Sequence, residues 1–324
     1  MATLVADIGA THARFQLADK TTLIGQPLVL ETLGFAQARQ MLKKAIAELG
    51  NPALEGAVLA LAGPRAPDTG AIQITNTGLA FTPGEVRDTL DCPAFLVNDF
   101  FALAHAVPGC EQVVQIGGSQ LDRGVKALLG PGTGLGMATL VPTPNATDEG
   151  SSRSSGWLVL ASEGGHADLA PGSFLEAELW GLLMQSHGHV SWETVLSGVG
   201  IKNLYAAVCA VWGSTPENLT AEDISTRGVS MDDPVCHQTL ETFCALLGAA
   251  AGSLALTVGA TGGVYIGGGI VPQIVEFAQT SPLRRRFDEC GDITDYAQNI
   301  ALWIIIEQTP GLRGALEYFD LVRE

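Results

Sequence analysis

The pattern of apolar and polar positions predicts strands and helices in mixed order along the chain. Short apolar runs bounded by glycine or polar residues predict buried strands at residues 3–8, 56–62, 94–97, 157–161 and 300–306. Residues 35–49 have helical spacing that ends at Gly50, and Thr82-Pro83-Gly84-Glu85 is typical of a helix start. Strands interleaved with helices indicate an α/β protein.

One pattern of strand, glycine loop and returning strand occurs twice. Its first copy has a strand at 3–8, a loop at 9–11 and an alternating strand at 14–18. Its second copy has the same three parts at 125–129, 130–136 and 137–141. After Ser173 the chain is mostly helical, and Pro310-Gly311 begins a last helix. We therefore expect two related domains.

The uncharged stretch 242–275 is long enough to cross a bilayer, but its glycines argue against a membrane helix. Glycine-rich breaks such as Gly262-Gly263 and Gly267-Gly268-Gly269 leave backbone groups that lipid cannot satisfy. The stretch instead predicts a buried helix to about Gly259, followed by a strand at 263–266.

Composition narrows the classes of protein that remain. The chain has 324 residues, 47% of them hydrophobic, with 17 Lys plus Arg against 34 Asp plus Glu. A net charge of −17 disfavours nucleic acid and anionic membrane surfaces as partners. Residues 1–7 lack the basic lead of a signal peptide. The six cysteines form no C-x-x-C pair, so we expect reduced thiols and a cytoplasmic protein.

Three glycine-rich turns are candidates for phosphate binding. They are Asp7-Ile8-Gly9-Ala10-Thr11, the segment 130–136 and Gly267-Gly268-Gly269. Glycine allows main-chain N–H groups to approach a phosphate closely, and Thr11 and Thr133 add hydroxyl donors. The chain contains neither a P-loop motif nor a G-x-G-x-x-G motif. Asp7 ends a strand beside the first turn, where its carboxylate could hold Mg²⁺ through water.

Polar residues that follow predicted strands are candidates for binding a ligand rich in hydroxyl groups. Asn98-Asp99 follows the strand at 94–97, although Asp99 could simply cap the next helix. Glu163 and His166 flank two glycines, and the alternative for His166 is a core histidine. Glu193 is either a surface acid or a ligand carboxylate.

The run Arg284-Arg285-Arg286 predicts a solvated helix face. Carboxylates bind hydroxyl groups strongly, so these candidates together with phosphate loops indicate phosphoryl transfer to a sugar.

These motifs together resemble the bacterial glucokinase family of the hexokinase and actin-like ATPase superfamily. The resemblance covers nearly the whole chain and rests on residues 7–14, Asn98-Asp99-Phe100, 130–136, Glu163-Gly164-Gly165-His166, Leu196-Ser197-Gly198 after Glu193, and 266–270. The family usually has glycine where Ala10 stands and often asparagine where His12 stands.

The resemblance implies ATP-dependent phosphorylation of the 6-hydroxyl of glucose, the first step of glycolysis, with Mg²⁺. It implies that Asp99 is the catalytic base and that Asn98, Asp99, Glu163, His166 and Glu193 bind the sugar. It assigns the ATP phosphates to Ala6, Asp7, Ile8, Gly9, Ala10, Thr11, Gly132, Thr133 and Gly134, and the adenosine to Gly267, Gly268 and Gly269.

The implied fold is the two-domain α/β actin-like ATPase (ribonuclease H-like) fold with an interdomain cleft that holds the sugar. The expected small domain is 1–109 with 302–324, and the expected large domain is 110–301. A kinase for another hexose and a non-catalytic sugar sensor remain alternatives, and a homodimer remains open.

Overall fold

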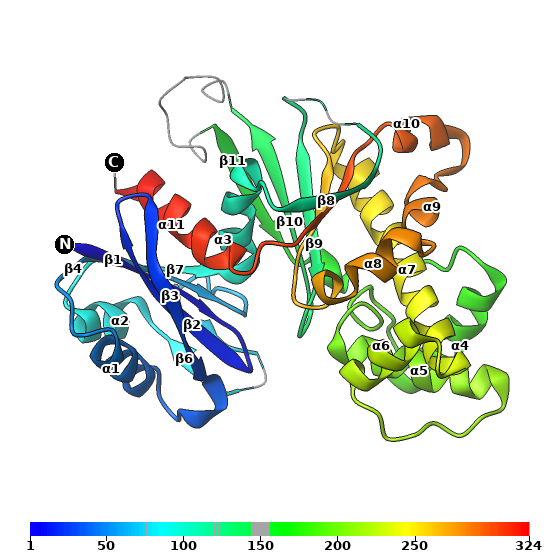
Figure 1. Ribbon diagram of the computed structural model, residues 1–324, viewed down its shortest axis with the longest axis horizontal. Coiled ribbons are helices and arrows are strands. Elements are labelled where there is room, and N and C mark those ends of the chain that lie inside the picture. The colour runs from blue at the N-terminus through cyan, green and yellow to red at the C-terminus, as the bar shows by residue number, and fades with distance from the viewer. Residues whose placement is uncertain (76, 120, 122, 144–155, 324) are drawn as a thin grey trace. The chain divides into compact units, whose positions relative to one another are not determined.

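The computed structural model describes residues 1–75, 77–119, 121, 123–143 and 156–323. The chain divides into two compact units, each built on its own sheet (Figure 1). The first unit comprises residues 1–111, 142–161 and 307–324, and the second comprises residues 112–141 and 162–306.

The sheet of the first unit has five strands in the order β3-β2-β1-β4-β7. They are β1 (Ala2–Ile8), β2 (His12–Asp19), β3 (Thr22–Glu31), β4 (Leu54–Leu61) and β7 (Ala94–Asn98). Strand β1 pairs antiparallel with β2 and parallel with β4, and β4 pairs parallel with β7. A separate two-stranded sheet joins β5 (Ile72–Gln73) to β6 (Ala80–Phe81). The predicted strands of this unit are confirmed to within two residues at each end.

Helices cover both faces of the first sheet because successive side chains of β1 point to opposite sides. Leu4, Ala6 and Ile8 pack with α1 (Ala38–Glu48) and α2 (Pro83–Leu90). Val5 packs with α3 (Asp99–Ala106) and α11 (Pro310–Val322) on the other face. Figure 1 shows α11 beside α3, so a C-terminal helix completes the unit that the N-terminal strand begins.

The second sheet has six strands in the order β11-β10-β9-β12-β13-β8, and all of it lies in the second unit except residues 157–161 of β11 and Pro142 at the end of β10. They are β8 (Val113–Gly117), β9 (Lys126–Pro131), β10 (Leu135–Pro142), β11 (Trp157–Ser162), β12 (Val264–Ile266) and β13 (Leu302–Ile305). Strand β9 pairs antiparallel with β10 and parallel with β12, which pairs parallel with β13. The series β10-β9-β12-β13 therefore repeats the arrangement β2-β1-β4-β7, which confirms the predicted internal repetition.

The helices of the second unit form one core with its sheet. They are α4 (Phe174–His187), α5 (Gly198–Trp212), α6 (Ala221–Ser230), α7 (Pro234–Val258), α8 (Val275–Thr280), α9 (Leu283–Asp288) and α10 (Thr294–Gln298). By length and composition α7 could cross a membrane, but Phe243, Leu247 and Ala251 on it are fully buried in this core. It ends at Gly259 with a φ of 65°, as predicted, and packs against α5, α6 and α9.

The prediction of a solvated arginine face is wrong for two of the three arginines. Only Arg285 is largely exposed, with 66% of its side chain accessible, against 17% for Arg284 and 9% for Arg286. Arg284 pairs with Asp288, four residues on, and donates to the carbonyl of Ile300. Arg286 pairs with Glu176 of α4, which is 110 residues away, so the run of basic residues gave no sign of this partner.

Candidate active site

The carboxyl edge of the first sheet brings together two segments that the sequence marked as functional. Ile8 of β1 lies in register with Leu61 of β4, which lies in register with Asn98 of β7. The loop after β1 and the Asn98-Asp99 pair after β7 therefore leave the sheet at the same edge, two strand spacings or about 10 Å apart. This edge is where open α/β sheets bind their ligands.

The loop after β1 is closed by main-chain hydrogen bonds. The N–H of Gly9 donates to the carbonyl of His12 at 3.0 Å, and the hydroxyl of Thr32 donates to the carbonyl of Gly9 at 2.7 Å. The side chains of Ala6 and Ile8 lie in the core, fully buried, so they do not face a ligand. In the predicted phosphate loop Thr11 is exposed, and Asp7, Gly9 and Ala10 are partly exposed.

Asp7 lies beside the first turn of α11, a neighbour that the sequence did not reveal. A Cβ added to Gly311 would lie 2.9 Å from Oδ2 of Asp7. The N-terminus of a helix favours a nearby negative charge. Burial raises the pKa of the Asp7 carboxyl, and Arg14, opposite it on β2, acts in the other direction. The carboxylate is therefore costly to ionise unless a cation approaches it.

Asn98, and not Asp99, is the cap of α3. Its Oδ1 accepts the N–H groups of Phe100 and Phe101 at 2.9 and 3.1 Å, and its Nδ2 donates to the carbonyl of Gly63 at 3.2 Å. Asp99 is the first residue of the helix, and its Oδ1 also accepts the N–H of Phe100 at 2.9 Å. The cap fixes the backbone from which the Asp99 carboxylate projects.

In the second unit, two of the predicted phosphate-binding turns lie against each other. Gly132–Gly134 forms the turn between β9 and β10, and Gly267–Gly269 follows β12, the strand next to β9. Gly268 has a φ of +83°, and a Cβ there would collide with the carbonyl oxygen of Pro131. The N–H of Ile270 donates to that same carbonyl at 3.3 Å. Only glycine allows the two turns to approach this closely.

The predicted sugar-binding residues of the second unit lie beside the glycine turn. Glu163 precedes a 3₁₀ turn, Gly164–His166, in which the His166 N–H donates to the Glu163 carbonyl at 3.0 Å. Oε1 of Glu193 is 3.9 Å from Nδ1 of His166. Oε2 of Glu193 accepts the N–H of Leu135, which directly follows the glycine turn, at 2.8 Å. Glu193 is therefore bound to the main chain beside the glycine turn and is not an isolated surface acid.

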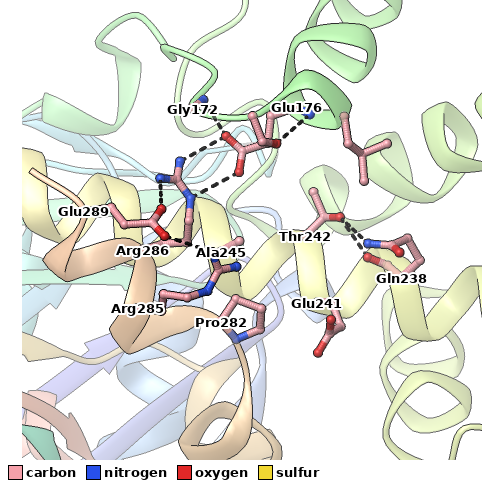
Figure 2. A pocket seen from close by; sticks show the side chains of 12 residues that line it. Gly172, Glu176, Gln238, Glu241, Thr242, Ala245, Pro282, Arg285, Arg286 and Glu289 are labelled. Carbon is pink, nitrogen blue, oxygen red and sulfur yellow. Dashed lines mark hydrogen bonds and ion pairs between the residues drawn. The ribbon is translucent and has the colours of Figure 1, made fainter. Parts of the chain in front are cut away.

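A cavity of about 360 Å³ in the second unit contains none of the predicted site residues. Figure 2 shows Arg286 on its wall between Glu176 and Glu289. The Arg286 Nη atoms lie 3.1 Å from Glu176 Oε2 and 2.9 Å from Glu289 Oε2, and the Gly172 N–H also donates to Glu176. Four charged side chains of this wall, Glu176, Arg285, Arg286 and Glu289, are thus paired with one another, which fits an ionic network that joins α4 to α9.

Solved structures of sugar kinases share this fold. A ROK family glucokinase from Streptomyces griseus, solved in complex with glucose and AMPPNP, is 17% identical and has a TM-score of 0.63, over 98% of this chain and 99% of that chain. A glucokinase from an Antarctic psychrotroph is 35% identical with a TM-score of 0.81, over 98% of both chains. The fold is therefore the two-domain actin-like ATPase fold of sugar kinases.

Sequence comparison narrows this class to one family. A model of the Glucokinase family matches residues 4–321. The glucokinase of Chromobacterium violaceum is 38% identical over 96% of this chain and 87% of its own length. The chain belongs to the glucokinase family.

Proposed function

We propose that this protein transfers the γ-phosphoryl group of ATP to the 6-hydroxyl of glucose. One observation carries the proposal: the Glu193 carboxylate lies 3.9 Å from the His166 ring and 2.8 Å from the main-chain N–H that follows the glycine turn. Acceptors suited to sugar hydroxyls thus lie next to main-chain donors suited to phosphate. Family membership and the glucose and AMPPNP in the Streptomyces griseus structure support the same assignment.

In this proposal Asp99 acts as the general base. The sugar oxygen forms a bond to the γ-phosphorus, the bond from that phosphorus to the ADP oxygen breaks, and the hydroxyl proton passes to Asp99. Because phosphoryl transfer has a loose transition state, positioning and charge neutralisation contribute most to the rate. Asp99 lies in the first turn of α3.

The remaining site residues divide between the two substrates. Asn98, Glu163, His166 and Glu193 would bind the sugar hydroxyls. Gly9–Thr11 and Gly132–Gly134 would bind the ATP phosphates, and Gly267–Gly269 would contact the adenosine. The contact between the last two turns supports a shared nucleotide, since a turn that binds phosphates lies beside one that would contact the nucleoside.

Mg²⁺ fits the surroundings of Asp7. The cation usually binds one or two carboxylates and keeps several waters, so a single, partly buried carboxylate is a sufficient protein ligand. Among residues 1–75, 77–119, 121, 123–143 and 156–323, no group of three or more His, Cys, Asp or Glu side chains could hold a metal. Mg²⁺ bound through Asp7 would neutralise charge on the ATP phosphates.

The cellular setting belongs to the same proposal. All six cysteines are free thiols, which supports a reducing compartment such as the cytoplasm.

Sedimentation of the purified protein would test the homodimer that the resemblance left open.

A coupled assay of ADP release tests the proposed activity. The purified protein is given Mg-ATP with glucose, mannose, fructose or glucosamine in turn, and kcat/KM is measured for each sugar. We expect glucose to give the highest value. A higher value for another hexose would make the protein a kinase for that sugar. Glucose binding in calorimetry without ADP release from any sugar would favour a non-catalytic sensor.

A further inference from the structure

Three separate segments of the second unit meet at the carboxylate of Glu193. The glycine turn contributes the N–H of Leu135, which donates to Glu193 Oε2 at 2.8 Å. The segment 163–166 contributes Gly165, whose carbonyl accepts the Glu193 N–H at 2.8 Å, and the ring of His166. The segment that holds Glu193 also reaches the glycine turn through Gly198, whose N–H donates to the Gly132 carbonyl at 2.8 Å.

The two oxygens of Glu193 therefore have different neighbours. Oε2 is held by the main chain at the end of the phosphate-binding turn, whereas Oε1 faces His166 at 3.9 Å. About a third of the Glu193 side chain is exposed, 32%, so the group is open to a ligand as well as anchored. A carboxylate can accept several hydrogen bonds, so it can bind a sugar hydroxyl and the Leu135 N–H together.

Gly134 is required by the position of this carboxylate. Its φ is not positive, so its backbone conformation does not demand glycine. A Cβ at this position would collide with Oε2 of Glu193 and would lie 3.2 Å from Cδ. An alanine at this position would therefore displace the Glu193 carboxylate from its hydrogen bond with the Leu135 N–H.

We propose that Glu193 is a positioning residue that couples the sugar site to the ATP phosphate loop, so that hexose binding orders the turn Gly132–Gly134. The inference rests on the proposed function and deepens it. A hydroxyl bound to Oε1 restrains the carboxylate, and the restrained Oε2 in turn holds the Leu135 N–H and the turn before it. Because such coupling is reciprocal, a bound nucleotide strengthens glucose binding by the same factor.

Isothermal titration of glucose with and without AMPPNP and Mg²⁺ measures this coupling. In the wild type we expect AMPPNP to lower the Kd of glucose by about 5- to 150-fold, the usual range for coupled sites. In Gly134→Ala, whose new methyl group displaces the carboxylate, glucose alone should bind about tenfold or more weakly, and the effect of AMPPNP should disappear. Gly198→Ala is the matched control, since its Cβ would lie 3.6 Å from the Gly132 carbonyl oxygen, an ordinary contact.

Glu193→Asp provides a second variant that keeps the charge but shortens the side chain by one methylene. It can no longer reach the Leu135 N–H and a sugar hydroxyl together, so we expect the AMPPNP effect on glucose affinity to be lost while the Tm stays near that of the wild type. A purely structural role for Glu193 would lower the Tm and leave the coupling factor unchanged in the folded protein.

The outcomes separate this inference from the proposed function. Wild-type glucose affinity in Gly134→Ala, or wild-type coupling in Glu193→Asp, would overturn the inference and leave the kinase assignment intact. Glucose binding without ADP release would overturn the proposed function, while the titration of glucose into Gly134→Ala would still decide whether the turn controls the sugar site. A wild type that binds no glucose would overturn both.

Discussion

Asn98 and Asp99 are neighbours in the chain, but their surroundings give them different roles. Asn98 uses its amide oxygen to cap α3 and its amide nitrogen to bind the Gly63 carbonyl. Asp99 accepts one of the same donors, the N–H of Phe100, through Oδ1. Asn98 is therefore the cap that fixes the start of α3, and Asp99 is the first residue of that helix.

Replacing Asp99 with asparagine separates these roles. Asp99→Asn keeps an oxygen that can accept the Phe100 N–H but cannot take a proton from the sugar, so kcat should fall by about 10²–10⁴-fold. The Tm should stay close to that of the wild type. Steady-state kinetics and thermal unfolding check both values, and a nearly normal kcat would remove Asp99 from its role as base.

Asn98→Ala is the companion variant. Loss of a helix cap typically costs about 1 kcal/mol, so this variant should lower the Tm where Asp99→Asn does not.

At the scale of elements, the network of Glu176, Arg286 and Glu289 joins the start of α4 to α9. Arg286 and Glu176 are 9% and 5% exposed, and Glu176 also accepts the Gly172 N–H. Removing one partner of a buried ion pair leaves an uncompensated charge and typically costs about 3–5 kcal/mol. We therefore expect Arg286→Ala to lower the Tm and the denaturation midpoint strongly.

Arg285→Ala offers a control one residue away. Arg285 is 66% exposed and pairs with Glu289 on the surface, so its loss should change stability by only about 0.5 kcal/mol. Equal destabilisation by the two variants would contradict the role given to the buried pair.

The packing of α3 on α11 predicts a pH dependence of stability. The ring of His105 packs against those of Phe101 and Tyr318, with centroids 4.9 and 5.3 Å away, and burial lowers the pKa of His105 to about 4 from an ordinary 6.5. Among the described residues neither ring nitrogen has a hydrogen-bond partner. The native state therefore binds fewer protons than the unfolded state between these two pH values. The contribution of His105 to the free energy of unfolding therefore falls by about 3 kcal/mol as the pH drops from 6.5 to about 4.

His105→Phe removes the proton-binding group and keeps an aromatic ring. At about pH 5 its Tm should exceed that of the wild type, and the difference should shrink at higher pH because the wild-type imidazole is then neutral in both states. His187→Ala, at an exposed position on α4, should leave the pH profile unchanged. Thermal unfolding across the pH range measures these differences. If the Tm of the wild type and that of His105→Phe changed in parallel with pH, His105 would not be the source of the pH dependence.

Elements were more predictable than the contacts between them. The central strands β1, β4, β7, β9 and β12 follow from apolar runs, because burial on both faces leaves a continuous pattern in the sequence. The sequence predicted neither β3 nor β8, whose side chains are mostly exposed or partly exposed. The helix before Gly259 follows from its glycine end. By contrast, the Glu176–Arg286 pair joins residues 110 positions apart, and only the tertiary fold brings them together.

In the candidate site, too, the residues were more predictable than the contacts between them. Sequence motifs indicated Asn98, Glu163, His166 and Glu193, but not the Leu135 N–H that Glu193 holds, because a main-chain donor has no residue type of its own. The one sign of this contact in the sequence was the glycine at position 134. Its φ is not positive, so its backbone does not demand glycine, and the close neighbour is the Glu193 carboxylate.

At the scale of the whole molecule, the cysteines and lysines show how this acidic protein distributes its reactive groups. Four of six cysteines are buried, and burial raises the pKa of Cys92 to about 11 and those of Cys236 and Cys244 to about 12. Only five lysines are present, and none lies in the three glycine turns, so in the proposed phosphate sites the donors within these turns are main-chain N–H groups and the hydroxyls of Thr11 and Thr133.

These thiols should be unreactive in the folded protein. The thiolate is the nucleophile, so a thiol reagent at neutral pH should label rapidly no more than the two partly exposed cysteines, Cys110 and Cys290. All six should react in denaturant, and a reducing agent should leave the Tm unchanged. Rapid labelling of four or more thiols in the native protein would contradict the burial described here.

The place of α11 also affects how the chain folds during synthesis. Helix α3 ends at Ala106, whereas the helix that covers it begins at Pro310. About 200 residues are translated in between, which takes roughly 10–40 s at 5–20 residues per second. During that time the second unit, residues 112–141 and 162–306, emerges complete while the first still exposes the apolar face of α3. The unit begun first on the ribosome is finished last, and its uncovered face is where a chaperone would be needed.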